Sequence, residues 1–427
     1  MRARRKPKPT SLNNLRARII QARKTQREKT TMSPDRFVEI DYCQSRKHNQ
    51  AVCGDLFAAR RHPEEKRVVA VLADGLGSGV KAGVLATLTG TIALRCAGER
   101  IDVRRTAAMI MDILPVCKER KIAYCTFTIV DAEQSGEIRV AEFENPPFVL
   151  LRDGRPQSVE SQRVPLKRPV ANGGREAFLN YSRFNLQEGD RLIFFSDGAT
   201  QAGTGNSAAP LGWGRQAIAE FAAEGVNGDN HISARSLACK IVRRALSFDG
   251  FKALDDITVG VVHYRRPRHL LLVTGPPLAA ENDSELARLA DGFSGRRVVC
   301  GGTTAAILAR ELKRSLRVNH EEIEQTLPPT SCMEGFDLVA EGALTMAALV
   351  GRLEEGESAE AEGNAADRLA RLLLDSDIVH FLVGTKVNDA HQEPDSPVEM
   401  DIRRNVIRRI RRLLEEKYCK ETRLRLI

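Results

Sequence analysis

Residues 67–97, RVVAVLADGLGSGVKAGVLATLTGTIALRCA, contain the strand, loop and helix that decide the fold. The run RVVAVLA (67–73) is almost continuously apolar, which predicts a strand buried on both faces. Apolar side chains then recur at helical spacing within 81–97, at Val84, Leu85, Leu88 and Ile92. Asp74 directly follows the strand, so its carboxylate lies at the rim of a sheet, where an unpaired acid is costly unless it meets a cation.

The segments around this stretch form clusters of strands and groups of helices. Turns at Gly136 and at Asp153-Gly154 predict a meander of three strands. The predicted strands are 122–131, 137–144, 148–156, 177–186, 190–198 and 255–264, and the predicted helices are 103–117 and most of 211–247. This grouping favours an α+β sandwich of antiparallel sheets covered by helices.

After Arg265-Arg266-Pro267 the pattern becomes a regular alternation of short apolar runs and helical segments. The strands are expected at 269–275, 296–302, 336–342 and 378–384, with helices at about 283–292, 303–316, 343–353 and 365–374. Alternation of this kind predicts a parallel sheet with helices on its faces. The segment 354–363 reads as an acidic loop, and 401–417 as a basic amphipathic helix that packs on its own domain through Ile402, Val406, Ile410, Leu413 and Leu414.

One turn in this second region has a chemical interpretation. In CGGTTAAILAREL (300–312) a strand, a glycine pair and a helix follow one another, with Thr303 or Thr304 expected as the N-cap. Free backbone N–H groups at such a helix start suit an anion, while a plain βα turn is the alternative. The ligand of this domain is unknown from the sequence.

Charge divides the 427-residue chain into three parts. The chain has a net charge of +9, of which residues 1–30 carry +10 and residues 401–427 carry +6, so the body is acidic at −7. A basic nucleic-acid groove in the main domain is therefore unlikely on composition. We expect a basic disordered tail at 1–31, a first domain at 32–266 and an α/β regulatory domain at 268–427.

Cellular location follows from what the sequence contains. No run reaches the ~18 consecutive apolar residues of a membrane helix, and the N-terminus lacks a secretory apolar segment. The nine cysteines are scattered and never form C-x-x-C, which is typical of reduced thiols in a protein interior. We expect a cytoplasmic protein without a membrane partner.

Other acids stand in positions like that of Asp74. Asp-Gly occurs five times, and at Asp153, Asp249 and Asp291 the context is a hairpin turn or a helix end. Asp197 instead follows the apolar run LIFFS, and strand-edge acids also occur at Asp55 in CGDLF and at Asp255-Asp256 in DDITV. Carboxylates that converge through the fold repel one another, and an oxygen-only ligand set favours Mg²⁺ or Mn²⁺.

The ordered motifs GDLF, VLADGLGSGVKA, FFSDG and DDITV resemble those of the SpoIIE-type branch of the metal-dependent protein phosphatase 2C class, over roughly residues 33–265. The resemblance implies an α/β/β/α sandwich, here followed by a smaller α/β domain with a parallel sheet. It also implies two Mn²⁺ or Mg²⁺ ions per active site that activate a water. By the same resemblance, Asp55 and Asp74 hold both metals, the Gly75 carbonyl binds the second, and Asp197 and Asp255 complete the first. Asp256 has a supporting or third-metal role.

Several functional groups stay open at this stage. Eukaryotic members of the class hold the substrate phosphate with an arginine, and Arg46 and Lys47 lie in no clear motif. His48 and His62 are nearby in sequence, although a surface histidine is the default interpretation of each. The glycines of DGLGSG lack the spacing of a dinucleotide-binding turn or P-loop.

The sequence thus predicts a phosphoprotein phosphatase that hydrolyses phosphoserine or phosphothreonine in a bacterial regulatory protein. The resemblance suggests an anti-sigma-factor antagonist as the substrate, and a homodimer is compatible with the chain. The alternatives are a catalytically inactive phosphatase-fold scaffold, against which the retention of all four acids argues, and a basic-tailed nucleic-acid-associated regulator. Loss of metal-dependent turnover in variants of Asp74 and Asp197 separates the enzyme from the scaffold.

Overall fold

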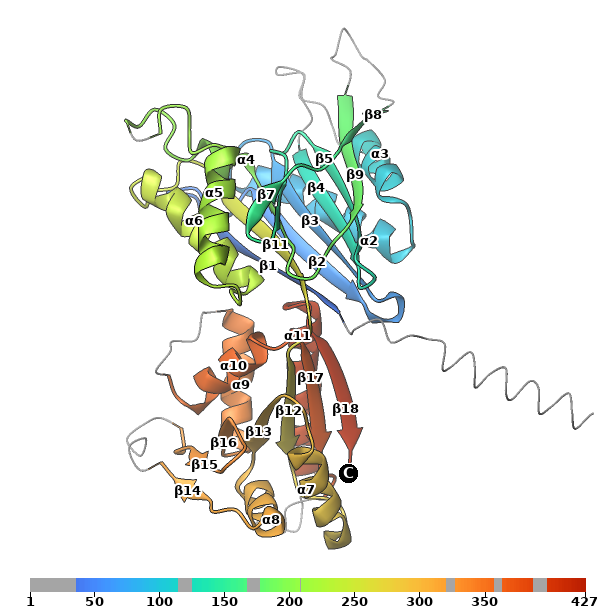
Figure 1. Cartoon of the computed structure of the whole chain (residues 1–427), viewed down its shortest axis with the longest axis vertical. Coiled ribbons are helices and arrows are strands. Elements are labelled where there is room, and N and C mark those ends of the chain that lie inside the picture. Colours follow the sequence, from blue (N-terminus) through green and yellow to red (C-terminus); the bar gives the residue numbers. More distant parts are fainter. Residues whose placement is uncertain are drawn as a thin grey trace, which may run out of the picture.

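The computed structural model describes residues 36–113, 125–166, 177–207, 209–319, 327–356, 363–386 and 398–427. The predicted tail 1–31 and most of the acidic loop 354–363 lie outside these residues. Two sheets make up the region from Phe37 to Arg265, and a third sheet makes up the region from His269 to Leu426. Figure 1 shows the two regions, one above the other.

The first region is a sandwich of two antiparallel sheets. One sheet has the order β1-β11-β10-β6-β7 and the other has the order β2-β3-β4-β5-β9-β8. The first sheet consists of β1 (Phe37–Ser45), β6 (Val149–Arg152), β7 (Arg155–Gln157), β10 (Arg191–Phe195) and β11 (Ile257–Arg265). The second consists of β2 (Asp55–His62), β3 (Arg67–Gly75), β4 (Cys125–Glu133), β5 (Glu137–Phe143), β8 (Gln162–Leu166) and β9 (Ala177–Asn185), with a 3-10 turn, η1 (Pro63–Glu65), between β2 and β3.

Strand β3 explains how the sandwich is built, because its side chains alternate between two cores. Val68, Ala70 and Leu72 face the other sheet. Val69, Val71 and Ala73 face the helices on the outer side. Both faces are therefore buried, as the continuous apolar run predicts.

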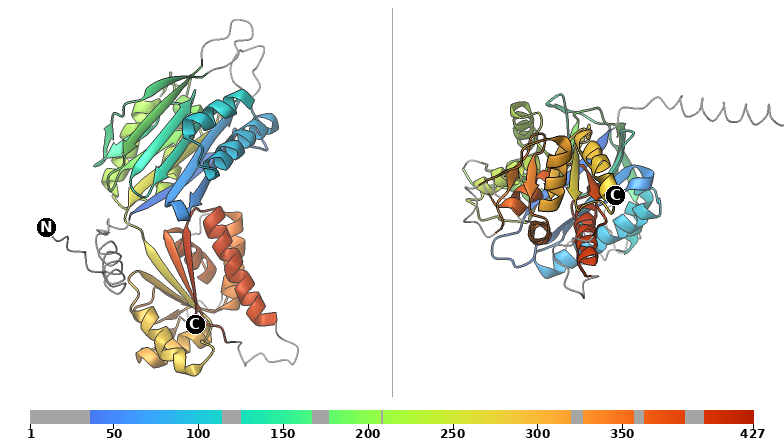
Figure 2. Two further views of the ribbon diagram at one scale, coloured as in Figure 1. Left: turned by 90° about the vertical axis from the view of Figure 1, so that its right-hand side faces the viewer. Right: turned by 90° about the horizontal axis from the view of Figure 1, so that it is seen from below.

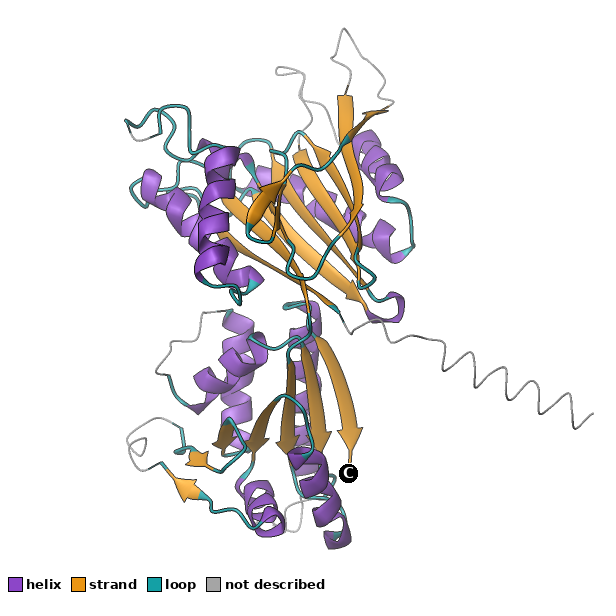
Figure 3. Cartoon of the chain, in the orientation of Figure 1, coloured by secondary structure: helices purple, strands orange, loops and turns teal. Residues whose placement is uncertain are grey.

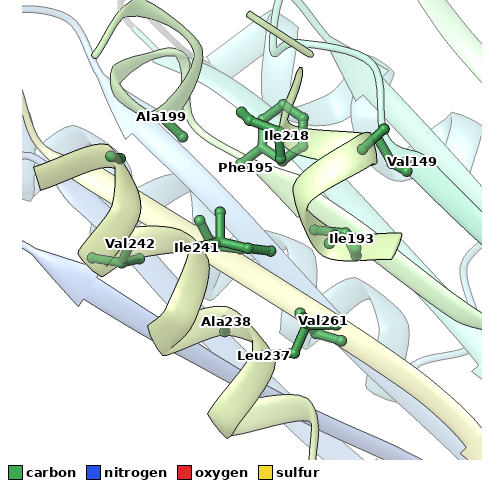
Figure 4. Packing of buried hydrophobic residues seen from close by; sticks show 14 of the residues in the cluster. Val149, Ile193, Phe195, Ala199, Ile218, Leu237, Ala238, Ile241, Val242 and Val261 are labelled. Carbon is green, nitrogen blue, oxygen red and sulfur yellow. The ribbon is translucent and has the colours of Figure 1, made fainter. Parts of the chain in front are cut away.

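Helices cover both outer faces of the sandwich, as Figure 3 shows. The β2–β8 sheet carries α2 (Val80–Gly98) and α3 (Val103–Ile113), and the other sheet carries α5 (Arg215–Gly228) and α6 (Ala234–Phe248), with the short α4 (Asp197–Gln201) at its edge. In Figure 4 Leu237 and Ile241 of α6 lie over Val261 of β11. The four layers confirm the predicted α/β/β/α sandwich.

By length and composition α2 is the one helix in the described ranges that could cross a membrane. Its small residues Ala86, Ala93 and Ala97 pack on the β2–β8 sheet, so in this fold it is a core helix.

The second region is a mixed sheet with helices on both faces. Its order is β14-β15-β16-β13-β12-β17-β18, and the five strands from β16 to β18 are parallel. The strands are β12 (His269–Thr274), β13 (Arg296–Cys300), β14 (Arg317–Val318), β15 (Ser331–Cys332), β16 (Leu338–Ala340), β17 (Ile378–Val383) and β18 (Glu421–Leu426). One face carries α9 (Ala343–Glu355), α10 (Ala365–Leu374) and α11 (Val398–Glu416), and the other carries η2 (Ala280–Asn282), α7 (Asp283–Asp291) and α8 (Gly302–Leu312).

Two features of this region differ from the sequence expectation. Helix α8 begins at Gly302 with Gly301 as its N-cap and no side-chain cap, so the expected Thr303 or Thr304 cap is wrong. Thr304 is instead buried in the first turn. The edge strand β18 was not predicted, because ETRLRL is mostly polar and exposed and pairs with β17, which is distant in sequence.

Helix α11 packs on its own domain as predicted. Its own residues Ile407, Ile410 and Leu414 are buried in the hydrophobic core between the helix and the sheet. Figure 2 shows the helix along the C-terminal sheet. The side chain of Ile402 lies outside the described residues.

A buried ionic cluster joins the two regions. Arg265, at the end of β11, donates two hydrogen bonds to Asp377 of the C-terminal region at 2.6 and 2.8 Å, and a third to Glu39 of β1 at 2.9 Å. Arg268 adds contacts to both acids. Arg61 of β2 also crosses the junction, donating to the carbonyl oxygen of Cys419 at 2.7 Å. The two regions therefore share a polar, closely fitted junction.

We predict that Asp377→Asn lowers the free energy of unfolding by about 3 kcal/mol, because it leaves two guanidinium groups with Glu39 as their one remaining buried counter-charge in the cluster. Asp377 is fully buried. Urea denaturation of the full chain measures the effect. The control is Asp375→Asn, which removes a half-exposed pair 3.5 Å from Arg296 and should cost less than about 0.5 kcal/mol. Equal effects of the two substitutions would contradict the assigned role of the cluster.

Candidate active site and metal centre

The candidate site lies at one end of the sandwich, where acids from both sheets face each other. Asp55 and Asp74 are direct partners in the β2–β3 register. Asp55 lies two residues before Phe57, and Asp74 lies two residues after Leu72. Side chains alternate along a strand, so both acids are on the same side as these two residues, which face the core between the sheets. On the opposite sheet, Ser196 follows β10 and Thr258 lies near the start of β11. The alternation of the strands therefore directs side chains of both sheets into one space.

A hydrogen bond connects the two sheets at this point. The Thr258 hydroxyl donates to Asp55 Oδ2 at 2.7 Å, and Gln44 of β1 donates both to Thr258 Oγ1 at 2.9 Å and to the backbone oxygen of Asp55 at 3.2 Å. Asp55 is 6% exposed, and its Oδ1 is buried with no hydrogen-bond partner among the described residues. One oxygen of this carboxylate is thus held while the other is available.

Asp197 and Asp255 lie at the more open side of the site. Asp197 begins α4, and its Oδ2 accepts a hydrogen bond from the Gln201 side chain one turn later at 2.8 Å. Asp255 precedes β11 and has Lys47 Nζ 3.7 Å from its Oδ1. Lys47 therefore places a cation at the edge of an otherwise acidic site.

Asp256 has a different environment from the other acids. It is buried, and its two oxygens accept the backbone N–H groups of Lys47 at 2.8 Å and of Gly54 at 2.9 Å. The carboxylate thereby fixes both ends of the loop that leads from β1 to Asp55. This contact gives Asp256 a supporting position behind the site.

Two motif glycines are required by the close approach of neighbouring backbone. A Cβ on Gly75 would lie 2.1 Å from the carbonyl oxygen of Ala82 in the first turn of α2, and a Cβ on Gly198 would lie 2.1 Å from the carbonyl oxygen of Asp256. Any larger residue would push α2 or the start of β11 away from the acids. The Asp-Gly pairs at 74 and 197 thus combine a carboxylate with a tightly packed turn.

Burial and mutual repulsion dominate the electrostatics of the site. Burial, with the charges of Asp55, Asp197, Asp255 and Asp256, raises the pKa of Asp74 to about 9. Burial also raises the pKa of Asp55 to about 7, against the opposing effect of its Thr258 hydrogen bond. The pKa of Asp197 is raised as well, by burial and then by Asp255. The described groups carry too little positive charge nearby to balance these acids.

This donor set fits divalent metal ions. The ligands are carboxylate oxygens, as Mg²⁺ and Mn²⁺ prefer, and the unpartnered Oδ1 of Asp55 points to a missing positive ligand. Among the described residues no three His, Cys, Asp or Glu side chains are already arranged as a metal-binding group.

The remaining candidates have other partners or positions. Arg46 donates to the carbonyl oxygen of Ala51 within its own loop. His48 is exposed, and His62 lies at the opposite end of β2 from Asp55. Asp153 occupies the β6–β7 turn with φ of 50°, Asp249 accepts backbone hydrogen bonds after α6, and Asp291 ends α7 in the other region. Their turn and cap interpretations agree with the structure.

Sequence reasoning missed the groups that hold Asp55. Gln44 and Thr258 are ordinary polar residues in strands, and nothing in one sequence marks them as partners. The one available signal was the alternation of side chains along a strand. Thr258 lies two residues after Asp256, so the sequence places the two side chains on the same face.

Comparison with known proteins identifies the class. Residues 64–265 match the family model of stage II sporulation protein E (SpoIIE). This part of the chain thus matches the SpoIIE family that the order of the motifs indicated, in agreement with the predicted phosphoprotein phosphatase. No curated protein sequence matches the chain.

Solved structures of this class are similar to the chain. The phosphatase domain of SpoIIE from Bacillus subtilis is 16% identical, with a TM-score of 0.40, over 55% of this chain and 94% of that one. The RsbU and RsbW domains of Rv1364c from Mycobacterium tuberculosis are 21% identical, with a TM-score of 0.41, over 60% and 68%. The SiaA-PP2C domain of Pseudomonas aeruginosa is 15% identical, with a TM-score of 0.38, over 58% and 94%.

We predict that Asp74→Asn raises the melting temperature of the protein in a metal chelator, by at least about 3 °C at pH 8 and by less at pH 5. The unfolded carboxyl ionises near pH 4, whereas the folded one has a pKa of about 9. The wild-type protein therefore loses stability as the pH rises between these values, and asparagine removes that loss. Thermal denaturation at both pH values measures the difference.

Asp153→Asn serves as the control for this experiment. Asp153 is an exposed turn residue, and asparagine tolerates its left-handed backbone. This variant should follow the wild type at both pH values. A melting difference for Asp74→Asn that is the same at pH 5 and pH 8 would show that the repulsion does not act as described.

Proposed function

We propose that this protein is a metal-dependent serine/threonine phosphatase that removes phosphate from a phosphoserine or phosphothreonine of a bacterial regulatory protein. The observation that carries the proposal is the group of acids at one end of the sandwich. Their pKa values are raised by burial and mutual repulsion, a state that bound divalent cations would relieve.

The assigned roles follow from position. Asp55 and Asp74 would hold both Mn²⁺ or Mg²⁺ ions, the Gly75 carbonyl would face the second, and Asp197 and Asp255 would complete the first. When bound, the pair of ions would activate a water for direct attack on phosphorus. Thr258 and Gln44 fix the orientation of Asp55, and Asp256 holds the loop that carries it.

Lys47 is the side chain that we assign to the substrate phosphate. It is partly exposed beside Asp255, while its backbone N–H is fixed by Asp256. The residue is therefore anchored through its backbone, while its ammonium group stays partly exposed beside Asp255, where an incoming dianion can compete for it. Lys47 would supply the positive charge that binds the substrate phosphate. Arg46 is not positioned for this role, because its side chain donates to Ala51 within its own loop.

The rest of the assignment concerns the partner and the second region. We propose an anti-sigma-factor antagonist as the substrate protein, a cytoplasmic location, and a regulatory role for residues 268–427. The buried ionic junction supports the regulatory role, because Glu39 of the phosphatase domain and Asp377 of the C-terminal region share the same two arginines. A rearrangement of one region must therefore break contacts of the other.

We predict that Asp74→Asn and Asp197→Asn each lower Mn²⁺-dependent hydrolysis of p-nitrophenyl phosphate by at least about 100-fold, because each removes a metal-binding oxygen. The full chain is assayed at saturating Mn²⁺, with a chelator blank. Asp153→Asn should retain wild-type turnover. Turnover within a few-fold of wild type in either site variant would refute the assignment.

Metal binding is measured separately from catalysis. Mn²⁺ should raise the melting temperature of the wild-type protein, because a ligand that binds only the folded state stabilises it. The shift should be lost in Asp74→Asn. A wild-type protein that shows the shift without any turnover would instead support the inactive scaffold.

We further predict that Lys47→Met lowers kcat/KM for a phosphopeptide by about tenfold, the worth of one charge-assisted contact. The Mn²⁺-induced melting shift should persist, because the backbone contact of residue 47 with Asp256 remains. The effect should appear mainly in KM. A loss of the melting shift in this variant would assign Lys47 to the metal site instead.

A further inference from the structure

Two free thiols face each other outside the candidate active site. Cys43 lies near the end of β1 and Cys239 lies in the middle of α6. Helix α6 packs across the outer face of the sheet that contains β1 and β11. Cys43 packs against the core under this helix, and each of the two thiols shifts the pKa of the other.

The neighbouring residues fix the alignment of the pair. Asp41 lies two residues before Cys43, on the same side of the strand, and Arg235 lies one helical turn before Cys239, on the same side of the helix. Arg235 and Asp41 form an ion pair at 3.5 Å. The ion pair therefore aligns Asp41 of β1 with Arg235 of α6, and the next positions on the same sides of the two elements are Cys43 and Cys239.

The two sulfurs differ in chemical character. The neighbouring Cys43 thiol lowers the pKa of Cys239, and the Arg235 guanidinium adds to this effect against the opposing effect of burial. The neighbouring Cys239 thiol and burial raise the pKa of Cys43. Cys239 is thus the better nucleophile of the pair, with a proton-bearing thiol beside it.

Access distinguishes this pair from most of the other described thiols; Cys53 is also partly exposed, but it lies in the loop before Asp55. Cys43 and Cys239 are both partly exposed, whereas Cys96, Cys125 and Cys300 are buried. Cys332 is exposed but lies in the C-terminal region. An oxidant in solution can therefore reach a thiol that has a second thiol at the matching position of the neighbouring element.

We propose that Cys43 and Cys239 form a reversible intramolecular disulfide when the protein meets a peroxide. The Cys239 thiolate attacks one peroxide oxygen, the O–O bond breaks, and a sulfenic acid and one water form after proton transfer. The Cys43 thiol then loses its proton and attacks the sulfenic sulfur, which releases a second water and closes the S–S bond. The peroxide is reduced and the two thiols are oxidised, and a dithiol reductant reverses the change.

The position of the bond connects it to the candidate site. Gln44 follows Cys43 directly and donates to the backbone oxygen of Asp55 and to Thr258. The sulfur atoms of a disulfide lie about 2 Å apart, so formation of the Cys43–Cys239 bond draws the end of β1 towards α6. We expect the movement to disturb the orientation of Asp55.

The test is peptide mapping of the full chain after treatment with hydrogen peroxide, alkylation of the remaining thiols and digestion with trypsin. The proposal predicts a linked pair of FVEIDYCQSR (37–46) and SLACK (236–240). The pair should disappear after dithiothreitol and in Cys43→Ser and Cys239→Ser, and it should persist in the control Cys332→Ser. Recovery of both peptides alkylated, or sulfinic acid at Cys239 without the linked pair, would overturn the proposal.

The effect on activity rests on the proposed function and is measured separately. Peroxide should lower the turnover of p-nitrophenyl phosphate at least about twofold in the wild type, reversibly with dithiothreitol, and leave Cys239→Ser unaffected. An unchanged turnover in protein that contains the linked pair would refute the connection to Asp55. A reduced protein without turnover refutes the proposed function instead, and the peptide map still decides whether the disulfide forms.

Discussion

Repulsion between buried carboxylates at the end of the sandwich is the constraint around which the first domain is organised. Asp55 and Asp74 are neighbours in one sheet, and Asp197 and Asp255 approach from the other. A protein interior tolerates such a group only if the surrounding structure holds it. Here Thr258 fixes Asp55, Asp256 fixes the preceding loop, and glycines admit the backbone of α2 and β11 at very short distance.

Local pattern was sufficient to predict much of this arrangement. The continuous apolar run at 67–73 predicted a strand covered on both faces, and the position of Asp74 directly after it placed the acid at the edge of the sheet. Alternation along β2 and β11 then determines that Asp55 and Thr258 point between the sheets. The order of the motifs indicated the family, because four short signals in sequence are far more specific than any one of them.

The remaining features depend on contacts between distant segments, which local pattern does not encode. Lys47 forms an ion pair with Asp255, which is more than two hundred residues away in the sequence. Asp256 accepts hydrogen bonds from backbone N–H groups of the loop 47–54. Thr303 and Thr304 resemble a helix cap, yet the tight turn at Gly301, with φ of 134°, starts the helix without one. Strand β18 forms its ladder of backbone hydrogen bonds with β17, at the edge of the sheet.

Strand β1 places three of these environments along one rigid element. Glu39 lies in the ionic junction, where His263, followed by Arg265 and Arg268, keeps its pKa below the usual value despite burial. Further along the strand, Cys43 lies beside α6, which carries Cys239, and Gln44 donates to the backbone oxygen of Asp55. Nine consecutive pairs with β11 hold the strand in register from Phe37 to Ser45. Such a strand moves as a unit more readily than it bends, so a change at the junction or at the thiols reaches the acids through a continuous path of bonded and packed atoms. None of the acids that we propose as metal ligands lies in this strand, so its displacement would act on them through Gln44 and its contacts with Asp55 and Thr258.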